Sequence, residues 1–138
     1  MSEENVELTR RAFVAFNRDG VEAFDNTDLW SPEIVFDGTP SGVPGMGVYR
    51  GYDEVWRFLE EDWFGVFPFE EWELELEELI DHDDHVIVMC RQRGRGTSSG
   101  VAAEVEFAII ESFRDGQLVR SDFYLDRGKA LEAAGLRE

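Results

Sequence analysis

Between residues 71 and 77, apolar and acidic side chains alternate without a break. Trp72, Leu74 and Leu76 occupy every second position, and glutamates fill the positions between them. Because successive side chains of a strand point to opposite faces of a sheet, this pattern predicts a strand with one buried and one solvated face. The rest of the chain must therefore cover one side of a sheet.

Three further segments toward the C-terminus are also predicted to be strands. They span residues 86–93, 101–113 and 118–125, and turn-forming sequences separate them. The sequence Arg114-Asp115-Gly116-Gln117 between the last two is typical of a tight hairpin. Together with the first strand, these segments predict four consecutive antiparallel strands.

Apolar residues at helical spacing precede these strands in two segments. We expect the first helix to end at Gly20 and the second to end after Trp63. The faces expected to be buried consist of Val6, Thr9, Phe13, Phe16 and Asn17 in the first helix, and of Tyr52, Val55, Trp56, Leu59 and Trp63 in the second.

Shorter elements are expected in the remaining segments. The sequence predicts a one-turn helix over Val21–Phe24, a short strand over 34–36 and a glycine-rich loop over 38–51. A last helix is expected over 129–134, with Asp126 as its N-cap.

This order of elements, without a repeat or linker, predicts one α+β domain over residues 1–138. We expect a cone-shaped α+β barrel, in which a strongly bent antiparallel sheet carries the N-terminal helices on its concave face. Four Trp and eleven Phe residues can fill the interior as an ordinary core. They are also numerous enough to line a pocket for a hydrophobic ligand.

Charge and cysteine content narrow the partners and the location. The chain has 31 acidic and 13 basic residues and a formal net charge of −18. Repulsion from phosphate groups argues against nucleic acid and against an anionic membrane surface as partners. The polar N-terminus, the lack of a long apolar segment and the single Cys90 predict a cytoplasmic protein without disulfides.

The C-terminal half carries a series of short motifs, which are Arg91–Gly96, Phe113–Arg120, Tyr124–Arg127 and Ala130–Leu136. Through these motifs and the order of its elements, the chain resembles the nuclear transport factor 2-like superfamily, and within it the bacterial SnoaL-like proteins of unassigned function. The superfamily includes ketosteroid isomerases, polyketide cyclases, limonene-epoxide hydrolases and non-catalytic binding or association domains. The resemblance implies a cavity and a homodimer, but it does not select an activity.

Asp37 is the first candidate catalytic residue. It follows a short apolar strand and precedes the glycine-rich loop, so its carboxylate is expected at the mouth of the cavity. Desolvation there would raise its pKa and make it a general base. Its position resembles that of the base in ketosteroid isomerases. The alternative is an Asx turn at the end of a strand.

Glu111 is the second candidate. It shares strand parity with Phe107, Ile109 and Phe113, so its carboxyl group is expected to point into the cavity as a proton donor. Isomerases of the superfamily keep a protonated acid in a comparable position to bind an oxyanion. A slip of one residue in register would turn Glu111 to the other face. The tyrosine that these isomerases carry on the first helix has no counterpart near Phe13.

Arg91 is a candidate for binding an anionic ligand or for pairing with Glu111. The alternative is cross-strand pairing with the glutamates of 71–77. Limonene-epoxide hydrolases carry an Asp two residues after this arginine and another on the last strand. The chain has Arg93 and Phe123 at those positions, so their catalytic relay is not reproduced.

The predicted function is binding of a small, mainly hydrophobic molecule in an internal cavity, with proton transfer in which Asp37 is the base and Glu111 the donor. A non-catalytic binding or association domain and an epoxide or ester hydrolase stay open as alternatives. No cofactor is expected, and no metal, because the acidic turn 81–85 is interpreted as solvated. The expected ligand contacts are Phe13, Phe16, Trp56, Leu59, Trp63, Phe67, Met89, Arg91, Phe113 and Phe123.

Overall fold

The computed structural model of the chain describes residues 2–19, 29–63, 69–82, 85–96 and 100–136. Its helices are α1 (Ser2–Asp19), the 3-10 helix η2 (Thr39–Ser41), α2 (Tyr52–Arg57), the π-helical segment η3 (Phe58–Trp63) and α3 (Arg127–Ala133). Its strands are β1 (Trp30–Asp37), β2 (Val48–Arg50), β3 (Phe69–His82), β4 (His85–Gly96), β5 (Ala102–Arg114) and β6 (Gln117–Tyr124). None of the helices described is long and apolar enough to cross a membrane.

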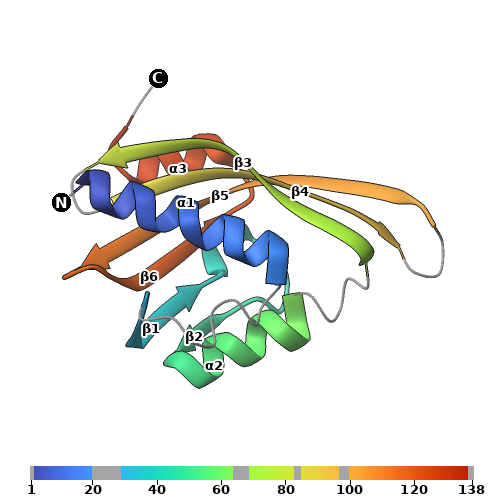
Figure 1. The fold of residues 1–138 in the computed structure, drawn as a ribbon, viewed down its shortest axis with the longest axis horizontal. Helices are drawn as coiled ribbons and strands as arrows, with labels where there is room; N and C mark the ends of the chain where they lie inside the picture. Colours follow the sequence, from blue (N-terminus) through green and yellow to red (C-terminus); the bar gives the residue numbers. More distant parts are fainter. Residues whose placement is uncertain (1, 20–28, 64–68, 83–84, 97–99, 137–138) are drawn as a thin grey trace.

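The strands form one curved, unclosed sheet in the order β2-β1-β6-β5-β4-β3 (Figure 1). The predicted antiparallel pairing of β3, β4, β5 and β6 is confirmed. The neighbours β1 and β6 are parallel, which places Phe36 beside Ser121 and Asp37 beside Asp122. The sheet is therefore mixed, whereas the sequence predicted antiparallel pairing throughout.

The two faces of the sheet bury separate apolar clusters. In β4, Val86, Val88 and Cys90 belong to the larger cluster, against which Phe13 of α1 packs. The residues between them, including Met89, belong to a smaller cluster with residues of α3. Because side chains alternate between faces along a strand, α1 and α3 cover opposite sides of the sheet (Figure 1). The predicted position of the N-terminal helix on the concave face is confirmed for α1.

A side chain near the end of α1 joins this helix to the sheet. The amide nitrogen of Asn17 donates to the carbonyl of Leu74 in β3 at 2.7 Å, and the Leu74 N–H donates to the amide oxygen of Asn17 at 2.8 Å. Leu74 belongs to the alternating segment that predicted a strand, and its side chain packs against the larger cluster. This double hydrogen bond helps to fix the position of α1 over the concave face.

Several boundaries differ from the sequence prediction. The predicted loop 38–51 contains η2 and β2, and the predicted single helix after Tyr52 becomes α2 followed by the π-helical η3. The Asp126 cap is confirmed, because its side chain accepts a hydrogen bond from the Lys129 N–H at 3.2 Å. The predicted helix Val21–Phe24 lies outside the described residues.

Candidate functional site

An apolar cavity of about 100 Å³ lies between α1 and the concave face of the sheet. The polar side chains among its described lining residues are Thr9, Glu111 and Ser121, and none of these lining residues is basic. The apolar lining consists of Ala12, Phe13, Phe16, Leu29, Trp30, Ile34, Phe36, Val55, Leu59, Leu74, Phe107, Ile109, Phe113 and Leu118. Among the described lining residues, one ionisable group therefore faces a space enclosed mainly by aliphatic and aromatic side chains.

Glu111 is that ionisable group. It lies on β5 and lines the cavity together with Phe107, Ile109 and Phe113, as their shared parity predicts. Burial raises the pKa of the Glu111 carboxyl to about 7, although hydrogen bonds with the side chains of Thr9 and Ser121 act to lower it. At neutral pH the protonated and ionised forms are both populated, which suits a group that accepts and returns a proton.

The carboxylate of Asp37 is held by hydrogen bonds, and Asp37 is not among the described residues that line the cavity. Its carboxylate accepts from the backbone N–H and hydroxyl of Thr39 at 2.9 and 2.7 Å, and from the Arg120 guanidinium at 3.0 Å. Burial alone would raise the pKa of Asp37, but the Thr39 hydrogen bonds and the charge of Arg120 outweigh burial and hold the pKa below its usual value. The expected upward shift is therefore wrong, and the alternative of an Asx turn at the strand end fits the Thr39 contacts.

The predicted ligand contacts divide into separate groups. Phe13, Phe16, Leu59 and Phe113 line the cavity. Phe123 is buried in the core, where its ring stacks with Phe36 at a centroid distance of 6.3 Å, and it is not among the lining residues.

The other predicted contacts lie elsewhere. Trp56 stacks on Tyr52 and does not line the cavity, and Met89 packs on the opposite face of the sheet beneath α3. The side chain of Trp63, and Phe67 as a whole, lie outside what the structure describes.

Arg91 does not reach Glu111 or the cavity. Its guanidinium forms ion pairs with Glu77 at 3.0 Å and with Glu104 at 2.8 Å, and it also contacts Glu106. These glutamates lie on the neighbouring strands β3 and β5, so cross-strand pairing is the arrangement that the structure has.

Two polar residues of the cavity were not predicted as site residues. Thr9 was expected on the buried face of the first helix, and Ser121 lies on β6, next to Glu111 in the sheet register. Thr9 lies four residues before Phe13, so helical spacing could have placed its side chain on the same buried face. The turn at Asp115 and Gly116 sets the hairpin register, so it could have placed Ser121 beside Glu111.

Other candidate chemistry finds no support in the described part of the chain. No group of three or more metal-binding side chains gathers within the described ranges. Cys90 is fully buried, and burial raises the pKa of its thiol, so it fits the predicted inert core cysteine.

Comparison with solved structures places the fold among known ones. A nuclear transport factor 2-like protein of unknown function from Burkholderia pseudomallei is 20% identical, with a TM-score of 0.71 over 94% of this chain and 95% of that chain. A putative SnoaL-like polyketide cyclase from a Jannaschia species is 16% identical, with a TM-score of 0.69 over 89% and 85% of the two chains.

A third structure is a hypothetical protein with a ketosteroid isomerase-like fold from Catenulispora acidiphila, in complex with trimethylamine. It is 14% identical, with a TM-score of 0.67 over 94% of this chain and 93% of that chain. No curated protein matches the sequence significantly. A family model of the SnoaL-like domain matches residues 9–121. The chain therefore belongs to the SnoaL-like domain family.

Proposed function

We propose that this protein binds a small, mainly hydrophobic carbonyl compound in the cavity beneath α1 and transfers a proton with Glu111. The observation that carries this proposal is one carboxyl group, with a pKa of about 7, among apolar cavity walls. A carboxyl group with this pKa serves as base in its ionised form and as acid in its protonated form near neutral pH.

The proposed step needs no cofactor. The Glu111 carboxylate takes a proton from the carbon next to the carbonyl, so a C–H bond breaks and an O–H bond forms on the carboxyl group. The electron pair moves onto the carbonyl oxygen as an enolate, and protonated Glu111 then returns the proton. Hydrogen bonds with Thr9 and Ser121 hold the carboxyl group in place between the two transfers.

Neighbouring proteins support this choice in a general way. The Catenulispora protein was crystallised with trimethylamine, and the Jannaschia protein is a putative polyketide cyclase. Both support a small-molecule function for a cavity of this fold. The base role predicted for Asp37 stays a separate prediction, which the same experiment tests.

Exchange of α-protons provides the test. Cyclopentanone in D₂O at neutral pH is followed by proton NMR with the wild-type protein and with Glu111→Gln, which keeps the shape but cannot accept the proton. We expect the protein-dependent exchange rate to fall about 100-fold or more in this variant. Glu33→Gln makes the same chemical change at an exposed residue and should exchange like the wild type.

Three results would contradict the assignment. Equal exchange in the wild type and in Glu111→Gln would remove Glu111 from the chemistry. Exchange that is lost in Asp37→Asn and kept in Glu111→Gln would transfer the role of base to Asp37. Cyclopentanone binding without any exchange would favour the non-catalytic alternative.

We also propose a homodimer and a cytoplasmic location, as expected from the sequence. Two exposed apolar side chains that line the same shallow pocket support association, since Val105 of β5 is 43% exposed and Leu125, directly after β6, is 40% exposed. Light scattering after size exclusion should give twice the 15.8 kDa of one chain, and a monomer mass would contradict the dimer.

A further inference from the structure

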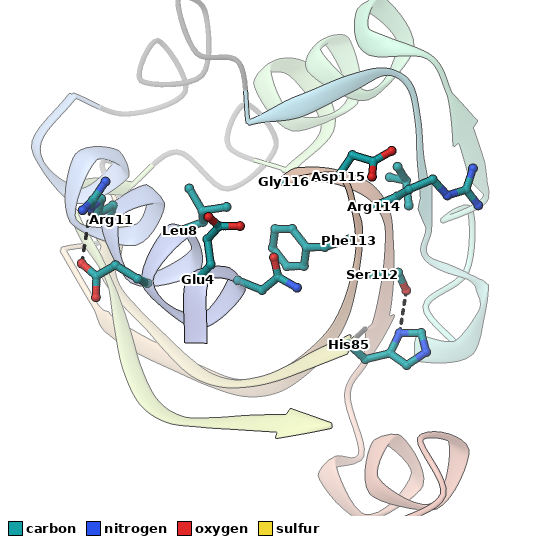
Figure 2. A pocket seen from close by; sticks show the side chains of 12 residues that line it. Glu4, Leu8, Arg11, His85, Ser112, Phe113, Arg114, Asp115 and Gly116 are labelled. Atoms are coloured by element: carbon teal, nitrogen blue, oxygen red, sulfur yellow. Dashed lines mark hydrogen bonds and ion pairs between the residues drawn. The ribbon is translucent and has the colours of Figure 1, made fainter. Parts of the chain in front are cut away.

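A groove of about 1000 Å³ opens beside the N-terminal half of α1. Asn5 and Leu8 of α1 line it, and Phe113 of β5 lies across from them. Figure 2 shows the ring of Phe113 pointing from β5 toward Leu8 and Glu4. The groove is a separate hollow from the apolar cavity, but the two share a wall.

Asn5 is the unusual residue of this groove. It is only 6% exposed, and its backbone carbonyl accepts a hydrogen bond from the Thr9 hydroxyl at 2.9 Å. No hydrogen bond to the side-chain amide of Asn5 is present among the described residues, and the amide is not one of the polar atoms that are fully buried without a partner. Because Asn5 lines the groove, its amide is open to a hydrogen-bonding group that binds there.

Phe113 separates the groove from the cavity. It is 6% exposed and lines both hollows. Thr9, one helical turn after Asn5, already lines the cavity beside Glu111. Because a helix rises 1.5 Å per residue, Asn5 and Thr9 lie about 6 Å apart along α1. A molecule of a few carbon atoms can therefore span from one hollow to the other once the Phe113 ring turns.

The size of the cavity favours such a molecule. The cavity holds about 100 Å³, whereas pockets for drug-sized ligands start at about 300 Å³. Only a small ring or a short branched alkyl group fits inside the cavity. A larger ligand can extend past Phe113 into the groove, because Phe113 lines both hollows.

The charges around Asn5 select the polar end of the ligand. Glu4, Glu7 and Asp115 line the groove together with Arg11 and Arg114, and Arg11 is already paired with Glu7 at 3.3 Å. With a net charge of −18 for the chain, a carboxylate or phosphate is repelled here. The Asn5 amide offers two N–H donors and one acceptor oxygen, which suit a neutral amide, carbonyl or hydroxyl group.

We propose that the groove is a second ligand subsite, an assignment that rests on the proposed function. It takes a neutral hydrogen-bonding end of an amphipathic small molecule whose mainly apolar, carbonyl-bearing end occupies the cavity beside Glu111. Asn5 is the residue that recognises the polar end, and Phe113 is the side chain that must move to join the two hollows.

Three probes separate the subsite from the cavity. Cyclopentanone fits the cavity alone, 5-methylhexanamide carries a branched alkyl end and a neutral amide four bonds away, and 5-methylhexanoate replaces the amide by a carboxylate. Binding is measured by NMR titration. We expect the amide to bind the wild type at least about 10-fold more tightly than the carboxylate.

Variants of Asn5 test the recognition. In Asn5→Leu, which removes the amide and keeps the volume, 5-methylhexanamide should bind about 2- to 10-fold more weakly. Cyclopentanone binding should be unchanged. Arg10→Ala, on an exposed position of α1, serves as the control. In the wild type, the side-chain NH₂ signals of Asn5 should shift with the amide and not with cyclopentanone, which needs no variant to fold.

The outcomes distinguish this assignment from the proposed function. If cyclopentanone binds, while 5-methylhexanamide leaves the Asn5 signals unmoved and binds Asn5→Leu as tightly as wild type, the groove is not a subsite and the cavity proposal stands. If neither cyclopentanone nor the amide binds, the cavity proposal fails and the subsite fails with it.

Discussion

Glu111 and Asp37 carry similar carboxyl groups in opposite environments. The Glu111 carboxyl faces an apolar cavity with hydroxyl groups as its polar partners, so burial dominates and its pKa rises to about 7. Asp37 receives hydrogen bonds from Thr39 and a charge partner in Arg120, so its pKa falls below the usual value. The partners of each carboxyl group determine the direction of its pKa shift.

Glu111 should make the stability of the protein depend on pH. Its folded pKa of about 7 exceeds the unfolded value of 4.5, so folding takes up a proton between these values. The contribution is present below pH 4.5 and is lost as the pH rises through 7. From pH 4.5 to 8, Glu111→Gln should gain about 3 kcal/mol of unfolding free energy relative to wild type. Urea denaturation across this range measures it, and a constant difference would contradict the assigned environment.

Asp37 should act in the opposite sense. The pKa of Asp37 is lowered in the folded protein, so its ionised carboxylate stabilises the fold at neutral pH. This stabilisation is lost as the pH falls through the folded pKa of Asp37. Asp37→Asn should cost about 1 kcal/mol at pH 7, since the Arg120 partner is partly exposed. The cost should shrink in acid, which urea denaturation of both proteins at pH 7 and in acid will show. An equal cost in acid would mean that the charge is irrelevant.

The sequence predicted which face of the sheet the Glu111 side chain occupies, but it did not predict the surroundings of Asp37. Phe107 and Ile109 make the parity of Glu111 readable in one strand. In β1, Ile34 and Phe36 are buried at alternating positions, so the side chain of Asp37 lies on the opposite face of the sheet from theirs. Its partner Arg120 lies 83 residues away, and no local pattern connects the two.

Strands with one solvent-exposed face could be predicted from the sequence, whereas strands that are buried on both faces or are very short were harder to predict. The alternation around Leu74 predicted β3, and the Asp115-Gly116 turn, where both residues have positive φ, predicted the β5–β6 hairpin. In β4, apolar residues follow one another because α1 and α3 cover both faces. Local parity therefore could not tell that Met89 and Arg91 point away from the cavity. The β1–β6 pairing joins distant segments, and β2 is too short to show a period.

The connection between α1 and β3 should be measurable. Asn17→Ala removes both hydrogen bonds to the Leu74 backbone, so we expect a loss of about 1 kcal/mol in unfolding free energy. Hydrogen exchange of the Leu74 amide should accelerate more than exchange elsewhere in β3, because its acceptor is gone. Arg10→Ala, on the same helix, should leave that amide protected. Unchanged exchange at Leu74 in Asn17→Ala would show that the contact does not hold the helix.

At the scale of the molecule, charge is the dominant property. A net charge of −18 makes the folded chain repel itself, and ion pairs such as Arg91 with Glu77 relieve only part of this repulsion.

Added salt should therefore stabilise the protein. Raising NaCl from about 20 to about 500 mM should increase the unfolding free energy by about 1 kcal/mol at pH 7, because screening weakens the repulsion. Near the isoelectric point of 4.3 the same salt should have little effect. Destabilisation by salt at pH 7 would mean that the ion pairs outweigh the repulsion.

The alternation of side chains along β6 has a further consequence. Ser121 contacts the cavity carboxyl group on one side of the sheet, and its neighbour Arg120 contacts Asp37 on the other. A single strand thus separates the buried carboxyl group of Glu111 from the ion pair between Asp37 and Arg120. A substitution at position 121 should therefore change the pKa of Glu111 and leave the ion pair between Asp37 and Arg120 intact. An inserted residue in β6 would exchange the two surroundings at once.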